Sequence, residues 1–141
     1  MNSSGTNSTG WDGSKMRTET LPAILAKMPE NIQNGIRSVN KRTAKSGSSS
    51  TIKTASDKLF TFSVMEVYGS AGYSHGGEGK QYDYYKAGNS EVKKVGSTAS
   101  VWWLRSPFKN SGDSFCTVTT SGSNDANSAD HSNGVCFGFC F

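Results

Sequence analysis

Three cysteines near the C-terminal end are the most reactive side chains in this sequence. Cys116, Cys136 and Cys140 could form a disulfide or a redox pair. If Cys136 and Cys140 share a strand, their Cα atoms are about 13 Å apart, because each residue advances a strand by about 3.3 Å. A disulfide spans only about 4.4–6.8 Å. We therefore expect the three cysteines to behave as small buried hydrophobic residues. A disulfide from Cys116 to either of the others, across a sheet, is still open.

The histidines and acids offer little for catalysis or metal binding. His75 precedes Glu78 in a Gly-rich stretch, where both side chains are expected to be solvated, and His131 has no convincing partner. Catalysis needs a positioned nucleophile, acid, base or metal, and no such set can be assembled. Runs such as EPN or WND, which would supply calcium ligands to a sugar site, are absent. We expect no catalytic residue, no metal and no cofactor.

One charged residue stands inside an apolar run. Arg105 belongs to ASVWWLRSP, a short β-prone segment that ends at a proline. An unpaired charge in a protein interior is very costly. If this segment is a core strand, the guanidinium of Arg105 must be fully hydrogen-bonded.

The N-terminal part predicts two short helices behind a flexible lead-in at residues 1–10. Ser14 is a plausible N-cap, and Pro22 suits the first turn of LPAILAKM. Pro29 then opens a second short helix, PENIQNGI. No other segment has clear helical periodicity.

The rest of the chain predicts short strands and long loops. Residues 38–43 suit a strand, and AKSGSSS after them is expected to be a disordered loop. KLFTFSV alternates as a half-buried strand, and its apolar character runs on into a turn at Gly69. A long loop follows, on which Tyr82, Tyr84 and Tyr85 fold back onto the body. FCTVTT predicts a hairpin strand with one solvent-exposed face. GVCFGFCF predicts a final strand that is paired within a sheet.

Composition limits the class of protein. The chain has 141 residues, a net charge of +4 and an aromatic rather than aliphatic set of core candidates, which suits one domain at residues 11–141. The sequence has no basic run interleaved with aromatic residues, which is the pattern that would predict nucleic-acid binding. No apolar stretch is long enough to insert into a membrane, and no signal peptide is visible. Any export to a cell surface or phage particle must be directed from outside this sequence.

Three sequence blocks in a fixed order resemble a known family. They are GWDGSKMRTETLP, STIKTASDKLFTFSVMEVYG, and WWLRSP followed after a polar run by GVCFGFCF. From Trp11 to Phe141 the chain is similar to domain of unknown function 6273, a bacterial and phage family that resembles the C-type lectin-like fold. The resemblance implies an α+β fold with two short N-terminal helices, small antiparallel sheets and long loops.

The resemblance also extends to the variable proteins of diversity-generating retroelements, in which reverse transcription of a template mutates adenines in a C-terminal segment. That segment would be residues 108–133 here. Template codons AAC or AAT, randomised at both adenines, never encode Met, Trp, Gln, Glu or Lys. Residues 108–133 contain none of these except Lys109, although a solvated loop rich in Asn, Ser and Gly would also tend to lack them.

The resemblance implies a ligand-binding surface made of short side chains. We predict that its members are Phe108, Asn110, Ser111, Asp113, Ser114, Thr117, Thr119, Ser123, Asn124, Asp125, Asn127, Ser128, Asp130, His131 and Ser132. Phe108 and Phe115 are the best aromatic anchors. We predict that the scaffold is fixed by Trp102, Trp103, Arg105, Gly134 and Phe139, with Ala126 and Ala129 holding loop geometry.

Three functions follow as alternatives. The first is a non-enzymatic display domain, diversified by a retroelement and recognising a protein or glycan. The second is an invariant structural or adhesion module of a larger surface or phage protein. The third is an enzyme of the formylglycine-generating kind, which the C-terminal Cys136 and Cys140 suggest but their phenylalanine neighbours oppose.

Overall fold

Two consecutive tryptophans organise the core on opposite sides of one strand. Trp102 and Trp103 begin β6 (Trp102–Pro107), and neighbouring side chains of a strand point to opposite faces. Trp103 packs into a cluster formed with Trp11, Leu21, Phe60 and Phe115. Trp102 packs into a second cluster formed with Val64, Val67, Tyr85, Cys116 and Val118. All residues of β6 are buried, as predicted for this segment.

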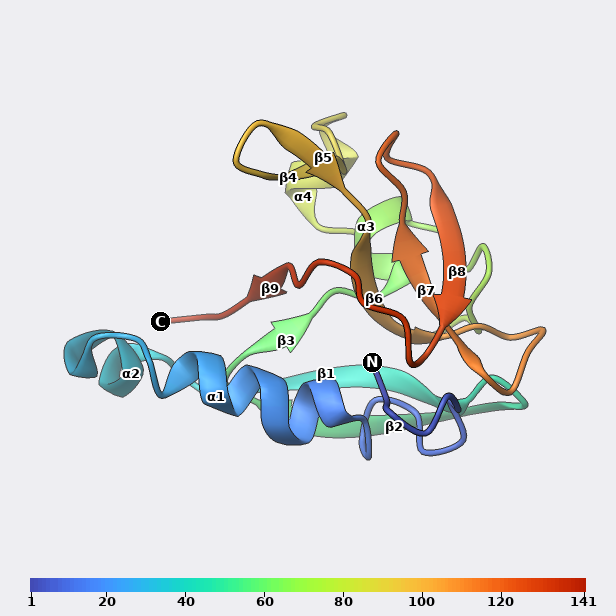
Figure 1. The fold of residues 1–141 in the computed structure, drawn as a ribbon, viewed down its shortest axis with the longest axis horizontal. Coiled ribbons are helices and arrows are strands. Elements are labelled where there is room, and N and C mark those ends of the chain that lie inside the picture. The colour runs from blue at the N-terminus through green and yellow to red at the C-terminus, as the bar shows by residue number, and fades with distance from the viewer.

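The computed structural model describes residues 1–141 and shows a mixed α+β domain with small antiparallel sheets (Figure 1). The largest sheet has three strands in the order β6–β7–β8, so that β7 (Ser114–Val118) is central and β8 (Asn124–Ser128) is an edge. The other sheets are pairs: β1 (Val39–Ser46) with β2 (Ser49–Asp57), β3 (Phe60–Thr61) with β9 (Phe137–Gly138), and β4 (Lys93–Val95) with β5 (Thr98–Ser100).

Both predicted N-terminal helices are present. A π-helical turn, η1 (Met16–Thr20), runs directly into α1 (Leu21–Leu25), and α2 (Glu30–Gly35) begins after Pro29. The Ser14 hydroxyl accepts a hydrogen bond from the Arg17 amide at 3.2 Å, as expected of a cap. No helix is both long and apolar enough to cross a bilayer.

Two further helices correct the sequence analysis. Residues 64–68 were expected to extend a strand into a turn, but they form α3 (Val64–Tyr68). The Ser63 hydroxyl accepts from the Glu66 amide, the Glu66 carboxylate accepts from the Ser63 amide, and Gly69 ends the helix at φ 71°. The tyrosine loop contains α4 (Asp83–Lys86); Tyr82 and Tyr85 pack against the body, whereas Tyr84 is 54% exposed.

Residues 1–10 are packed against the domain, which corrects the expectation of a flexible lead-in. The Asn2 amide donates to the Ala129 carbonyl at 2.8 Å. Asn7 is fully buried against the loop that precedes β7. These contacts stabilise a segment whose composition is typical of disorder, because its few polar side chains satisfy backbone groups elsewhere in the chain.

The expected disordered loop at residues 44–50 is a tight hairpin instead. Strand β1 continues through Ser46, and β2 starts at Ser49 after a two-residue turn. Gly47 is buried in this turn, where an added Cβ would overlap the carbonyl oxygens of Phe108 and Ser111. Close approach of two backbones explains this glycine better than loop flexibility does.

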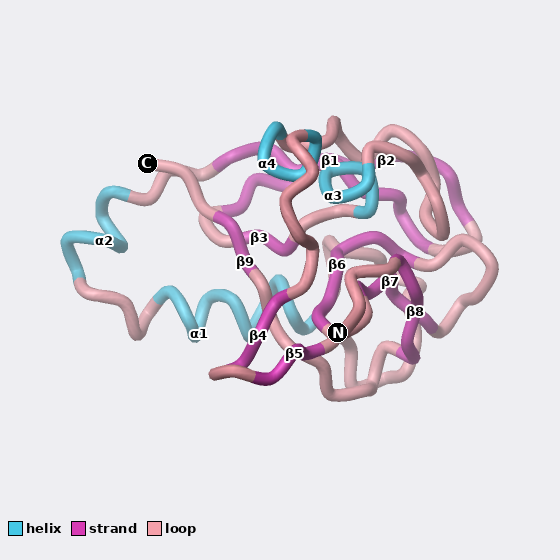
Figure 2. The backbone as a smooth tube through the Cα atoms, turned by 90° about the horizontal axis from the view of Figure 1, so that it is seen from above, coloured by secondary structure: helices cyan, strands magenta, loops and turns pink.

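The C-terminal segment is tied into the fold, but it is less regular than GVCFGFCF suggested. Strand β9 has two residues, and the Arg37 amide donates to the Cys140 carbonyl at 2.8 Å. Phe139 and Phe141 are 41% and 64% exposed, so the expected burial of one face stops at Phe137. The C-terminal end lies beside α2, away from β7 and β8 in both views (Figures 1 and 2).

Candidate functional site

Residues 108–133 form a hairpin with two flanking loops. The first loop joins β6 to β7, the tip joins β7 to β8, and the second loop leaves β8. Of the predicted contact residues, seven are exposed: Asn110, Asp113, Ser123, Asp125, Asp130, His131 and Ser132. Seven others are half-buried: Phe108, Ser111, Ser114, Thr119, Asn124, Asn127 and Ser128. Most of the predicted set therefore lies, exposed or half-buried, on the edge strand β8, on the tip of the hairpin and on the two flanking loops.

Strand β7 departs from the prediction. Thr117 is 1% exposed and Phe115 is 0% exposed, so neither side chain can belong to a contact surface. The predicted solvent-exposed face is absent, because β7 is the central strand of its sheet and both of its faces are covered by other parts of the protein. Phe115 packs in the Trp103 cluster, whereas Cys116 packs in the Trp102 cluster.

Phe108 is the aromatic residue that remains available on this surface. It is half-buried, and its ring lies 5.5 Å from that of Tyr73, which is 43% exposed. Phe108 and Tyr73 form a small apolar patch beside the start of the polar segment 108–133. Tyr73 precedes the predicted variable segment, so composition alone could not place it here.

The surface is acidic, although the chain is basic. Residues 108–133 contain three aspartates and one lysine, whereas the whole chain carries a net charge of +4. Hydrogen bonds from Ser111 and Ser114 lower the pKa of the Asp113 carboxyl. A hydrogen bond from Ser128 likewise lowers the pKa of Asp130. Both exposed carboxylates are charged at neutral pH, and these hydrogen bonds keep them charged to a lower pH than an ordinary aspartate.

Asn7 fixes the first loop from beneath. Its Nδ2 atom donates to the carbonyls of Ser111 and Ser114, each at 2.7 Å, and its Oδ1 atom accepts from the Gly47 amide at 3.1 Å. The His75 Nε2 atom lies 2.9 Å from the Gly47 carbonyl. Asn7 therefore holds the loop through backbone atoms of the loop and of the β1–β2 turn.

The Asn7→Ala variant is expected to unfold with a free energy lower by about 1–3 kcal/mol, because it leaves buried backbone groups without partners. Urea denaturation followed by circular dichroism measures the change. The Asn110→Ala variant, which removes an exposed amide from the same loop, should differ from the unmodified chain by less than about 0.5 kcal/mol. Equal stability of the two variants would contradict this role for Asn7.

Arg105 lies at the centre of a buried polar network, as its position in an apolar run required. Its guanidinium is 0% exposed and contacts both carboxylate oxygens of Glu66, at 2.6 and 2.8 Å. It also donates to the Thr43 hydroxyl at 3.0 Å and to the Thr61 carbonyl at 2.7 Å. The side chain thereby joins β1, β3, α3 and β6.

Lys41 is the second cation of the network. Its Nζ atom lies 2.9 Å from a Glu66 oxygen, donates to the Tyr82 hydroxyl, and lies 3.7 Å from the centre of the Phe60 ring. Burial alone would raise the pKa of Glu66, but hydrogen bonds and charge from Arg105, with Lys41, lower it. Burial lowers the pKa of Lys41. Neither the lysine nor its acidic partner stood out in the sequence.

Glu78 is fully buried, which corrects the expectation of a solvated His75 and Glu78 pair. Its carboxylate accepts from the Ala44 amide at 2.9 Å and from the Ser106 hydroxyl. Burial raises the pKa of Glu78. His75 is half-buried and contacts a backbone carbonyl instead, so these two side chains do not act together.

The three thiols are free and lie in different environments. Cys116 is buried as expected, Cys136 is half-buried, and Cys140 is exposed against expectation. Burial raises the pKa of the Cys116 and Cys136 thiols. Because the thiolate is the reactive form, these two thiols are poor nucleophiles at neutral pH. No group of three His, Cys, Asp or Glu residues is placed to hold a metal ion.

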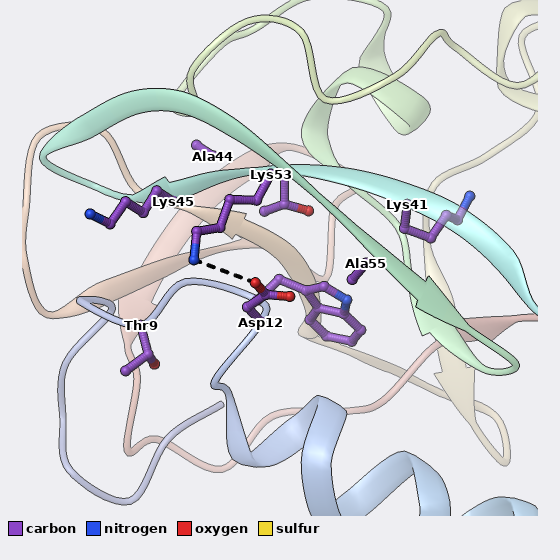
Figure 3. Close-up of a pocket in the computed structure, with 9 residues that line it drawn as sticks. Thr9, Asp12, Lys41, Ala44, Lys45, Lys53 and Ala55 are labelled. Carbon is purple, nitrogen blue, oxygen red and sulfur yellow. Dashed lines mark hydrogen bonds and ion pairs between the residues drawn. The ribbon is translucent and has the colours of Figure 1, made fainter.

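One lysine-lined hollow is too small to be a ligand site. It lies between residues 9–12 and the β1–β2 hairpin, and the ammonium of Lys53 lies 3.5 Å from an Asp12 oxygen across it (Figure 3). Its volume is about 10 Å³, which is about the space that one water molecule needs. The charged groups here join the N-terminal segment to the hairpin.

The fold and the site define a small α+β domain in which a buried Arg–Glu–Lys network supports an exposed polar hairpin. The family "Domain of unknown function (DUF6273)" matches residues 1–140, and the chain belongs to that family. No curated protein and no solved structure matches the chain.

Proposed function

We propose that this chain is a non-enzymatic ligand-binding domain of the C-type lectin-like type, with residues 108–133 as its recognition surface. The observation that carries the proposal is a contrast in burial. Exposed, short, polar side chains lie on the loops around the β7–β8 hairpin and at Asp125 on β8, whereas β6 and residues 115–118 of β7 are buried. Exposed positions of this kind can change with little effect on folding.

Diversification by a retroelement is the second part of the proposal. The residue types in 108–133 are those that randomised AAC or AAT codons can supply, apart from Lys109. Lys109 is exposed, and its backbone amide donates to the Tyr73 carbonyl at 2.9 Å. Its codon must then lie outside the randomised set.

The acidic charge of the surface supports a protein or glycan partner with basic groups. Three exposed carboxylates in residues 108–133, against one lysine, favour a positively charged partner, and long-range attraction of this kind raises association rates. Few aromatic side chains are available as binding hot spots, so the affinity would depend chiefly on Phe108 and Tyr73. We place such a domain on a cell surface or phage particle.

Two features of this chain disfavour the enzymatic alternative. Formylglycine-type chemistry would need reactive thiols, but burial raises the pKa of Cys136. Cys140 is exposed, and it is next to the C-terminal residue, whose end of the chain lies away from β7 and β8 (Figure 1). If variants with Cys136→Ser and Cys140→Ser still bind the protein or glycan ligand of residues 108–133, the result would agree with the proposal.

A codon-restricted library tests the display function directly. We expect that randomising Asn110, Asp113, Asp125 and His131 with codons ending in a pyrimidine leaves most variants folded, with stability changes within about 0.5 kcal/mol per position. Proteolysis of displayed variants measures the folded fraction, and selection against unrelated proteins measures binding.

The matched control library randomises Phe115, Thr117 and Val118 with the same codons. These side chains are buried, so most variants of this library should be unfolded. Equal folded fractions in the two libraries would refute the division into scaffold and surface. Neighbouring DNA without a reverse transcriptase and a near-identical template repeat would refute the retroelement part alone.

A further inference from the structure

A second hollow lies outside residues 108–133 and combines aromatic walls with two opposite charges. Its volume is about 480 Å³, within the range of about 300–1,000 Å³ that is typical of small-molecule sites. It is lined by Phe62, Tyr82, Asp83, Tyr84, Tyr85, Lys93 and Cys136. Phe62 follows β3, Tyr82 precedes α4, and the other two tyrosines and Asp83 belong to α4. Lys93 begins β4, and Cys136 precedes β9.

The aromatic walls are held in place by edge-to-face packing. The Phe62 ring lies 5.6 Å from Tyr82, 6.2 Å from Tyr85 and 6.1 Å from Trp102, in each case close to perpendicular. Tyr84 packs edge-on against Tyr85 at 5.1 Å and remains 54% exposed. The apolar surface is therefore fixed by the core before any ligand arrives.

Neither charge at the hollow has an ion-pair partner in the protein. The Lys93 ammonium lies 5.4 Å from the centre of the Tyr84 ring and 5.5 Å from that of Tyr85. The ion pairs of the chain join other residues, and none includes Lys93 or Asp83. Because the lysine already occupies the position of a cation over the rings, a purely cationic ligand is disfavoured.

We propose that this hollow binds a small zwitterion with a flat apolar body, namely a free amino acid with an aromatic side chain. The carboxylate of the ligand would pair with Lys93 and its ammonium with Asp83. Its ring would pack against Phe62 and Tyr82, because Lys93 already lies over the Tyr84 and Tyr85 rings. Two full, unpaired charges of opposite sign favour fully charged groups on the ligand, because charge-assisted hydrogen bonds are about twice as strong as neutral ones.

Calorimetric titration with L-phenylalanine and three analogues tests the proposal on the unmodified chain. Phenylalaninamide lacks the carboxylate, N-acetylphenylalanine lacks the ammonium, and glycine lacks the apolar body. We expect L-phenylalanine to bind. The amide and the N-acetyl analogue should bind about tenfold more weakly or worse, the effect of losing one charged hydrogen bond, and glycine should also bind at least about tenfold more weakly because it buries no apolar ring. Absence of saturation by millimolar L-phenylalanine, or equal binding of the amide, would overturn the proposal.

Variants of the two charges provide the second arm. Lys93→Met and Asp83→Asn should each weaken L-phenylalanine about tenfold. Lys94→Met, at the exposed neighbour in β4, and Glu30→Gln, at the corresponding first-turn acid of α2, should bind as the unmodified chain does. Saturable binding of methyl glucoside that is indifferent to both charges would identify a sugar site instead and would also overturn the proposal.

Discussion

Replacing Arg105 with methionine is expected to lower the free energy of unfolding by about 3–5 kcal/mol, which is the usual effect of removing one partner of a buried ion pair. The substitution leaves the Glu66 carboxylate buried with Lys41 as its only cation, and it leaves the Thr61 carbonyl without its donor. Methionine fills a similar space, so the loss should come from electrostatics and hydrogen bonding rather than from a cavity.

Urea denaturation followed by circular dichroism measures this change, with Arg42→Met as the matched control. Arg42 precedes Thr43 on the same strand and is exposed, so its substitution should alter the free energy of unfolding by less than about 0.5 kcal/mol. The double variant Arg105→Met with Glu66→Gln should lose less than the sum of the single variants, because no carboxylate is then left uncompensated. Strict additivity would show that the pair does not act as a unit.

The two buried glutamates, Glu66 of the network and Glu78 outside it, should affect stability in opposite directions as the pH changes. The pKa of Glu66 is lowered in the folded state, so its contribution is present above the unfolded pKa and is lost as the pH falls. The pKa of Glu78 is raised, so its contribution is present at low pH and is lost as the pH rises. Glu78→Gln should therefore make the free energy of unfolding fall less, or not at all, as the pH rises above the usual glutamate pKa of about 4.3, as urea titrations would show.

Much of the regular structure could be predicted because the sequence signals there are local. A proline in the first turn of α1, a proline before α2 and the aromatic run at the start of β6 identify these elements without knowledge of the rest of the fold. Helix α3 carried an equally local signal in Ser63 and Glu66, spaced as a capping box. It was missed because Val64 and Val67 also suit a strand.

Other features depend on contacts distant in sequence and could not be predicted. Strand β8 is polar and has the composition of a loop, and its strand form depends on pairing with β7. Residues 1–10 have no apolar pattern, but Asn7 is buried by atoms more than one hundred residues away. The sequence predicted that the Arg105 guanidinium is hydrogen-bonded, but it could not identify the partner. Glu66 lies 39 residues earlier, and no periodic pattern links the two positions.

Trp103→Ala is expected to lower the free energy of unfolding by about 3–5 kcal/mol, through lost burial and the cavity left behind. Since domains of this kind unfold with about 5–15 kcal/mol, this is a large share of the total. Trp103 packs with Phe115, which belongs to the strand that pairs with β8. The substitution should thus loosen the support of the polar hairpin before the rest of the domain.

Hydrogen exchange followed by mass spectrometry resolves this effect along the chain. In Trp103→Ala, the amides of β7 and β8 should lose more protection than those of the β1–β2 hairpin, while Trp103→Phe should behave closer to the unmodified chain because it retains an aromatic ring. Asp125→Ala, on the exposed edge of the same sheet, should leave the protection of β7 unchanged. Uniform loss of protection across the domain in Trp103→Ala would contradict a separable support for the hairpin. It would mean that the two aromatic clusters on either side of β6 unfold as one unit.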